Sequence, residues 1–111
     1  MDRTERYRDI LKQVIQEYAT YGKDPPGVET YASIDPFRDS YSVQRTGWDR
    51  QRYLHGCIIH MDLKDGKIWV QHDGTNLPVV DELEAAGVPK EDIVLGFIPP
   101  NRRKYTEYAI G

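Results

Sequence analysis

Five side chains that can bind metal ions or move protons lie close together in one stretch of the sequence: His55, Cys57, His60, Asp62 and His72. Imidazole, thiolate and carboxylate groups are ligands for transition metals, so this composition raises the question of a metal site. Such a site needs at least three of these groups on one side of the backbone. Their positions relative to one another therefore decide what chemistry is available.

A predicted β-hairpin sets these positions. Asp65-Gly66 is a strong signal for a two-residue turn, and a turn there places Met61 opposite Val70 and Asp62 opposite Trp69. One face of the hairpin then carries Cys57, Ile59, Met61, Leu63, Ile68 and Val70, and the other carries Ile58, His60, Asp62, Trp69, Gln71 and Asp73. We expect the first, more apolar face to be the core.

This register separates the candidate ligands. It places His60 and Asp62 on the opposite face from His55, Cys57 and His72, so we expect no metal site. On the apolar face Cys57 is expected to be a small, buried, unreactive side chain. The glycines are dispersed and form no phosphate-binding loop. We therefore predict no catalytic residue, no metal and no cofactor, so the protein is not expected to be an enzyme.

A metal-dependent nuclease remains an alternative, because the hairpin also supplies acidic side chains and a lysine in Asp62, Lys67 and Asp73. Their spacing matches no nuclease motif. Metal analysis and a DNA-cleavage assay with Mg²⁺ or Mn²⁺ would separate this alternative from a non-enzymatic role.

The polar face of the hairpin is the first candidate for an interaction surface. It combines His60, Asp62, Trp69 and Gln71, and a large aromatic ring among polar groups is typical of interface centres. The competing interpretation is that a helix packs on this face, in which case Trp69 belongs to the core. The sequence leaves both interpretations open.

A second candidate lies near the C-terminus, where Arg102, Arg103 and Lys104 precede Tyr105. These cations could bind phosphate or an acidic partner, although such a run is more often a solvated surface. The net charge of -3 and the pI near 5.6 argue against a protein whose main task is to hold a phosphate backbone. Direct DNA binding, aided by Arg3, Arg6 and Arg8, is therefore an alternative rather than the expectation.

The elements that position these residues follow from periodicity and turn signals. Apolar residues at helical spacing predict a helix over residues 3–21, with Asp2 or Thr4 as its N-terminal cap. Alternation predicts two strands over residues 28–34 and 41–43, a break at residues 47–50, and a long strand over residues 52–64. A short helix is predicted for residues 78–86. The short apolar run at residues 93–97 could be a strand or the end of another helix, and we favour the strand. A helical turn or docked tail is predicted for residues 101–110.

These elements predict an α+β fold: a long N-terminal helix packed on an antiparallel sheet of four to five strands, with one or two short C-terminal helices. The length of 111 residues suits one domain over residues 1–111. The longest apolar run is too short to span a bilayer, so we expect no membrane association and a cytoplasmic location. The 2 tryptophans and 8 tyrosines favour a homodimer, with the Trp69 face as the expected contact and Tyr105 and Tyr108 as the alternative patch.

Three stretches carry a resemblance to a known family. They are residues 6–19 (RYRDILKQVIQEYA), residues 55–75 (HGCIIHMDLKDGKIWVQHDGT) and residues 89–109 (PKEDIVLGFIPPNRRKYTEYA). Together with Gly47-Trp48-Asp49, they resemble the XisI family over nearly the whole chain. Residues 22–40 are the least similar part.

The resemblance implies a role beside other proteins. Members of this family, with a companion called XisH, control excision of the fdxN element by a site-specific recombinase in cyanobacteria. The resemblance thus implies an XisH-like partner and a recombinase complex, with the catalysis carried out by the recombinase. It transfers no catalytic residue to this chain.

Overall fold

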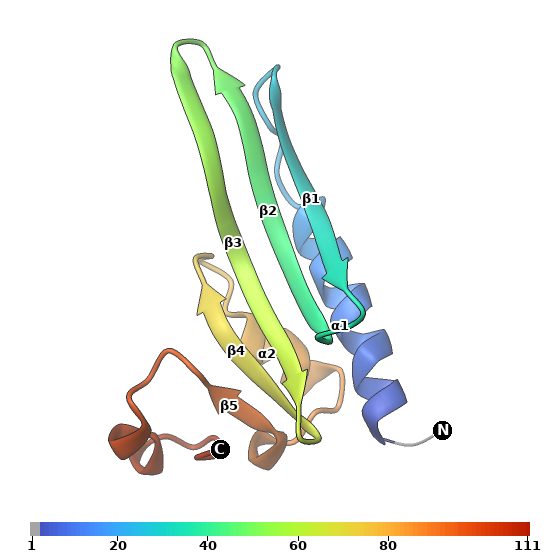
Figure 1. Cartoon of the computed structure of the whole chain (residues 1–111), viewed down its shortest axis with the longest axis vertical. Helices are drawn as coiled ribbons and strands as arrows, with labels where there is room; N and C mark the ends of the chain where they lie inside the picture. Colours follow the sequence, from blue (N-terminus) through green and yellow to red (C-terminus); the bar gives the residue numbers. More distant parts are fainter. Residues whose placement is uncertain (1–2) are drawn as a thin grey trace.

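The computed structural model describes residues 3–111 (Figure 1). The chain begins with helix α1, continues through four consecutive strands, and ends in short helices around a fifth strand. The elements are α1 (Arg3–Ala19), β1 (Val28–Asp35), β2 (Ser40–Asp49), β3 (Arg52–Lys64), β4 (Lys67–Asp73), α2 (Val79–Ala85), η1 (Lys90–Asp92), β5 (Ile93–Leu95) and η2 (Pro100–Tyr105).

Helix α1 confirms the predicted N-terminal helix, although it ends two residues earlier, at Ala19. Its buried stripe is Tyr7, Leu11, Val14, Ile15 and Tyr18, the spacing that places side chains on one side of a helix. The predicted cap Asp2 lies outside the described residues. The helix therefore presents one apolar side to the sheet.

The sheet has the strand order β1-β2-β3-β4-β5. The first four strands are antiparallel, whereas β5 pairs with β4 in parallel, so the sheet is mixed rather than wholly antiparallel. The predicted break at residues 47–50 is wrong for its first part, because β2 continues to Asp49 and only Arg50 and Gln51 form the turn. Gly47 makes this continuation feasible, since its φ of 131° suits a residue without a side chain.

Two β-bulges change which residues share a face. The β3–β4 register near the turn is as predicted, with Met61 opposite Val70 and Asp62 opposite Trp69. Beyond it, however, His60 pairs with His72, which leaves Gln71 as an extra residue. A second bulge lies between β2 and β3, where Ile58 is the extra residue. Each bulge reverses the alternation beyond it.

The predicted division of the ligand-type residues between two faces is therefore wrong. Thr46, Gln44 and Ser42 alternate along one face of β2, and their partners on β3 are His55, Cys57 and His60. These three thus share a face, and the pairing of His60 with His72 adds a fourth. Cys57 is exposed rather than buried.

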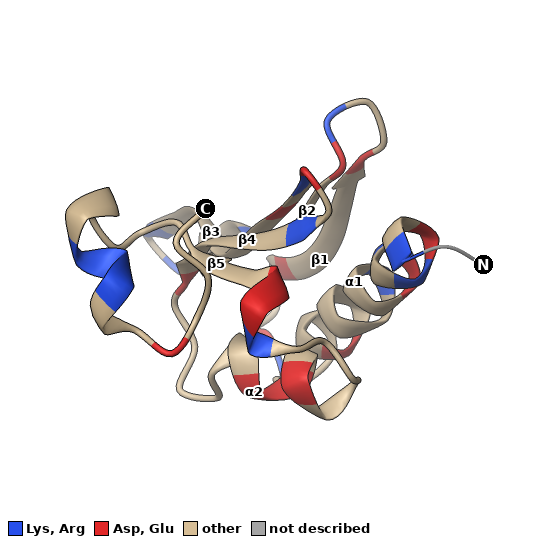
Figure 2. Cartoon of the chain, turned by 90° about the horizontal axis from the view of Figure 1, so that it is seen from below, with Lys and Arg blue, Asp and Glu red and all other residues tan. Residues whose placement is uncertain are grey.

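The two faces of the sheet differ in what covers them. Helices α1 and α2 lie together on one side, as Figure 2 shows, and the core forms between them and the sheet. That core includes Tyr41 and Val43 from β2 and Ile59, Met61 and Leu63 from β3. No helix within residues 3–111 is long and apolar enough to cross a membrane.

Candidate functional site

The sheet face that α1 and α2 leave uncovered is the first candidate site, and we call it the open face. Alternation along β1, β2 and β3 assigns its residues. They are Glu29, Tyr31, Ser33, Asp35, Ser40, Ser42, Gln44, Thr46, Trp48, Tyr53, His55, Cys57, His60, Asp62 and Lys64. Its middle is poor in charge, since small polar and aromatic side chains separate Glu29 from the charged residues Asp35, Asp62 and Lys64 near the other end.

The predicted residues His60, Asp62 and Gln71 are brought together on this face. His60 Nε2 lies 3.0 Å from Asp62 Oδ1 and 3.1 Å from Ser40 Oγ. Gln71 Nε2 donates to Asp62 Oδ2 at 3.2 Å. The serine and the carboxylate thus meet the same imidazole nitrogen. A catalytic Ser-His-Asp relay uses both nitrogens, so this network positions side chains but has no relay geometry.

Trp69 lies beside this network on β4, opposite Asp62. It does not lie under α1, which packs against the other face; instead two cations flank its ring. Lys64 Nζ is 4.3 Å and the Arg103 guanidinium carbon 5.2 Å from the ring centroid. The buried Trp69 Nε1 has no hydrogen-bond partner among the described residues. Trp69 is thus a half-buried ring held by its own chain at the edge of the open face.

The four C-terminal candidate residues do not act as one cluster. Arg103 is half-buried, and its guanidinium donates to the carbonyl oxygens of Ile98 at 3.0 Å and Gly96 at 3.3 Å. Arg102 and Lys104 are exposed, as is Tyr105, of which 79% is accessible. Within the basic run, Arg103 therefore binds its own chain, whereas Arg102 and Lys104 are exposed to solvent.

The N-terminal arginines form no common surface with this run. Figure 2 shows the basic residues of η2 and those of α1 on opposite sides of the molecule. Arg6 donates to the carbonyl oxygen of Gly87 at 2.8 Å, and Arg8 binds Asp39 at 2.9 Å. Much of this positive charge is therefore used within the chain.

The residues of the nuclease alternative are likewise separated and engaged. Lys67 Nζ donates to the carbonyl oxygen of Gly111 at 2.6 Å. Asp73 accepts from the Thr75 hydroxyl at 2.7 Å and from the Val79 backbone at 2.8 Å. In the described part of the chain, no three histidine, cysteine or acidic residues are arranged to hold a metal ion.

An aromatic cluster at the end of the β2–β3 hairpin was not predicted. Trp48 and Tyr53 pair across the strands with ring centroids 5.1 Å apart, and the His55 ring stacks 6.4 Å beyond Tyr53. Trp48 is 58% and Tyr53 53% exposed. Continuity of β2 through Gly47 creates this cluster, so the predicted break concealed it.

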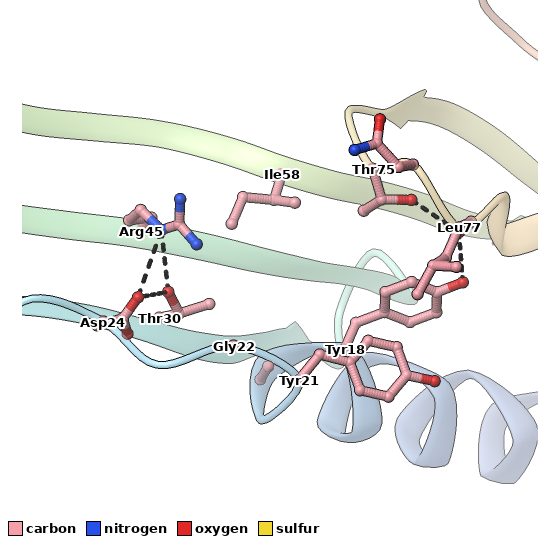
Figure 3. Close-up of a pocket in the computed structure, with 11 residues that line it drawn as sticks. Tyr18, Tyr21, Gly22, Asp24, Thr30, Arg45, Ile58, Thr75 and Leu77 are labelled. Carbon is pink, nitrogen blue, oxygen red and sulfur yellow. Dashed lines mark hydrogen bonds and ion pairs between the residues drawn. The ribbon is translucent and has the colours of Figure 1, made fainter.

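A cavity of about 230 Å³ on the helix-covered side was also missed (Figure 3). It lies where α1 ends beneath the upper part of the sheet, between Tyr18, Tyr21, Ile58 and Leu77. The bulge at Ile58 turns this side chain toward the cavity, and nothing in the local sequence signals that bulge.

Several of the polar groups that line the cavity bind one another or the backbone. The Tyr18 hydroxyl donates to the carbonyl oxygen of Leu77 at 2.6 Å, and Arg45 Nε donates to Thr30 Oγ1 at 3.1 Å while its ion pair with Asp24 spans 3.6 Å. Burial, followed by the charge of Glu82, raises the pKa of Tyr18 to about 12. The hydroxyl therefore remains a donor at neutral pH, and the cavity is a largely apolar slot with Tyr18, Thr30 and Arg45 held in hydrogen bonds along its walls.

The thiol of Cys57 is less acidic than an ordinary thiol, despite its place on the open face. Partial burial of the sulfur raises the pKa of the thiol, although the residue as a whole is exposed. Its Sγ donates to the carbonyl oxygen of Ile59 at 3.2 Å. A nucleophilic cysteine requires a lowered pKa, so Cys57 is not arranged for nucleophilic chemistry.

Comparison with known proteins identifies the family of the chain. No curated protein matches it. A XisI-like protein from Anabaena variabilis ATCC 29413 is 36% identical, with a TM-score of 0.93 over 97% of this chain and 99% of that one. The fdxN element excision controlling factor XisI from the same organism is 37% identical, with a TM-score of 0.85 over 99% and 100%. The family model described as XisI protein matches residues 1–110, and on these grounds the chain belongs to the XisI family.

Proposed function

We propose that this protein is a regulatory factor for site-specific excision of a DNA element, and that it acts through protein contacts without catalysing strand cleavage. Support comes from the similar protein named fdxN element excision controlling factor XisI. The role of a controlling factor fits a chain whose candidate residues form a surface rather than a reaction centre. The finer proposal is that its partners are an XisH-like protein and a complex containing a recombinase.

The open face is the observation that carries this proposal. Interface centres are depleted in charged residues and enriched in aromatic ones, and this face combines Trp48, Tyr53 and Tyr31 with a middle row of serine, threonine and glutamine. Hydrogen bonds such as Gln44 Nε2 to Ser42 Oγ, at 3.1 Å, hold that row in place. A rigid, weakly charged surface loses little solvation or conformational freedom when a partner covers it.

The test is binding to a purified XisH-like protein, measured by titration calorimetry. Gln44→Lys places a charge in the middle of the open face, and we expect it to weaken binding at least tenfold because the ammonium group would be buried unpaired. Gln16→Lys is the matched control, since Gln16 is exposed on α1. Absence of binding at micromolar concentrations of both proteins, or equal loss in both variants, would contradict the proposal.

Two other results would favour the alternative functions. Cleavage of DNA in Mg²⁺ or Mn²⁺ by the protein alone, together with bound metal in elemental analysis, would indicate a nuclease. Binding of duplex DNA that weakens steeply with added salt would indicate direct contact with the phosphate backbone.

A further inference from the structure

The upper half of β3 has a strand edge with no neighbour. Strand β4 pairs only with Ile59–Lys64, and after it the Gly74 backbone N–H donates to the Ile58 carbonyl oxygen at 2.8 Å. Residues 52–57 therefore project about 20 Å beyond β4 at the usual rise per residue. Figure 1 shows this part of the β2–β3 hairpin extending past β4 and β5.

The hydrogen-bonding groups on this edge can be assigned. The Trp48 N–H donates to the Gly27 carbonyl oxygen at 3.0 Å, on the β1 side, so it does not bond to β3. Its cross-strand partner Tyr53 therefore directs its own N–H and C=O away from β2. By alternation His55 and Cys57 do the same, and none of the three bonds through its backbone to any loop or turn within residues 3–111.

The other sheet edges are protected in the usual ways. The edge strand β1 carries Glu29 and Asp35 and is followed by Pro36, and charge and proline discourage pairing with another strand. Strand β5 is short and forms a parallel bridge from Val94 to Ala109. Residues 53–57 lack this protection, since they contain no charged residue and no proline.

Gly56 has no role within its own chain that explains the absence of a side chain. Its backbone φ is not positive, and a Cβ built there would meet no atom within 4 Å. Glycine weakens a strand interior and often marks a place where another backbone approaches closely. Here the approaching chain must come from another molecule.

We propose that two copies of this chain pair antiparallel along this edge, about a two-fold axis at His55. This register places His55 opposite its own copy and Tyr53 opposite Cys57 of the second copy. All outward-facing N–H and C=O groups of these three residues are then satisfied. It also places Leu54 opposite the second copy's Gly56, in a position where the two backbones approach most closely.

A second copy fits this edge better than an unrelated strand because the segment is complementary to itself. In both halves of the contact, the large side chain of Leu54 lies against Gly56 of the other copy. A two-fold interface requires this repetition. Arg52 is the one charged residue of the projecting segment. Antiparallel pairing places the two Arg52 residues at opposite ends of the contact, so their charges do not face each other. In the dimer, the open faces of the two copies would form one continuous surface. The pairing does not depend on the regulatory function proposed above.

Sedimentation of the full chain tests the association. We expect a dimer of twice 12.9 kDa at tens of micromolar protein. Gly56→Val should raise the dimer dissociation constant at least tenfold without destabilising the monomer, because the new side chain enters open space within the chain but occupies the place of Leu54 from the second copy. Gly22→Val is the matched control, since Gly22 also has no atom within 4 Å of an added Cβ.

A cross-link tests the register. Under diamide, which accepts the two electrons and two protons of the thiols, Tyr53→Cys should form a covalent dimer with Cys57 of the second copy. The unaltered chain should not, because its two Cys57 residues lie four residues apart along the pairing. Tyr31→Cys, on β1, should also remain uncross-linked. A monomer in sedimentation, an unaffected dimer in Gly56→Val, or equal cross-linking of Tyr53→Cys and Tyr31→Cys would overturn the proposal.

Discussion

Asp92 is a buried carboxylate whose position depends on a single tyrosine. It is 6% exposed and accepts a hydrogen bond from the Tyr7 hydroxyl, with Arg3 NH1 at 3.6 Å. Tyr7→Phe would leave the carboxylate without this donor while preserving the ring in the core. We expect the unfolding free energy to fall by about 1–3 kcal/mol, measured by urea denaturation. Tyr31→Phe, at an exposed ring on β1, should change it by less than about 0.5 kcal/mol; equal effects would contradict this role.

Adjacent arginines provide a second comparison. Arg103 packs over Trp69 and donates to two backbone carbonyls, whereas Arg102 is exposed. Arg103→Ala should therefore lower the unfolding free energy by about 1–3 kcal/mol, and Arg102→Ala should have almost no effect. Thermal unfolding followed by circular dichroism would measure both, and a similar melting temperature for the two variants would refute the structural role of Arg103.

The sequence predicted which side chains lie together better than it predicted what each of them does. His60, Asp62 and Gln71 were predicted to lie on one face, and hydrogen bonds join them there, although Gln71 is the extra residue of a bulge. The role of Arg103 was not predictable, since its acceptors on Gly96 and Ile98 depend on how the chain after β5 folds back. A run of three cations carries no sign of which member binds the protein itself.

Among the elements, the hairpin register was predictable close to its turn and not far from it. Asp65-Gly66 specifies the pairing locally, and the pairs from Lys64 and Lys67 to Met61 and Val70 agree with the structure. The bulges at Ile58 and Gln71 have no glycine, proline or other marker at the bulged position, so the faces beyond them were assigned wrongly. The wrong expectation that Cys57 is buried follows directly from the missed bulge at Ile58.

The attachment of α1 to the β1–β2 turn is expected to depend on pH. Arg8 donates to both carboxylate oxygens of Asp39, at 2.9 and 3.0 Å, and this contact lowers the pKa of Asp39 below its usual value. A carboxyl group with a lowered pKa stabilises the folded state above its ordinary pKa near 4, and this contribution is lost as the pH falls through the folded-state value.

Arg8→Met tests this dependence. The variant should be less stable than the unaltered protein at pH 7, and this difference should shrink as the pH is lowered from 7 toward 2, because protonation of Asp39 removes the ion pair from the unaltered protein as well. Urea denaturation across this range would measure it. Arg38→Met, at an exposed residue of the same turn, should show no such convergence; a constant difference for Arg8→Met would rule out the ion pair as its cause.

At the scale of the molecule, the sequence predicted the α+β class because helix and strand periods are local properties. The parallel pairing of β5 was not predictable in this way. Ile93–Leu95 is too short to have a period of its own, and its direction depends on the crossover through α2. Similarly, the apolar cavity arises only because β1, β2 and β3 continue past the end of α1.

The whole fold should lose stability in alkali, because buried tyrosine hydroxyls join its layers. The pKa of each of Tyr7, Tyr18, Tyr41 and Tyr108 is raised from 10.0 to about 12, first by burial and then by acidic neighbours. Tyr7 and Tyr18 lie on α1, and Tyr108 donates to Glu84 of α2 at 3.0 Å. Ionisation therefore places negative charge at several junctions of the fold at once.

Because these pKa values are higher in the folded than in the unfolded chain, their contribution is complete below pH 10 and is lost as the pH rises through about 12. We expect the unfolding free energy to fall steeply over this interval, and tyrosinate absorbance at 295 nm to rise together with loss of the far-ultraviolet circular dichroism signal. Tyr108→Phe removes one such group, so it should reduce the slope of stability against pH by about one linked proton, or about 1.4 kcal/mol per pH unit at most. A slope that is unchanged in this variant would show that the Tyr108 hydroxyl ionises equally in the folded and the unfolded chain. A free energy of unfolding that is constant from pH 10 to 12 would rule out the contribution of all four tyrosines.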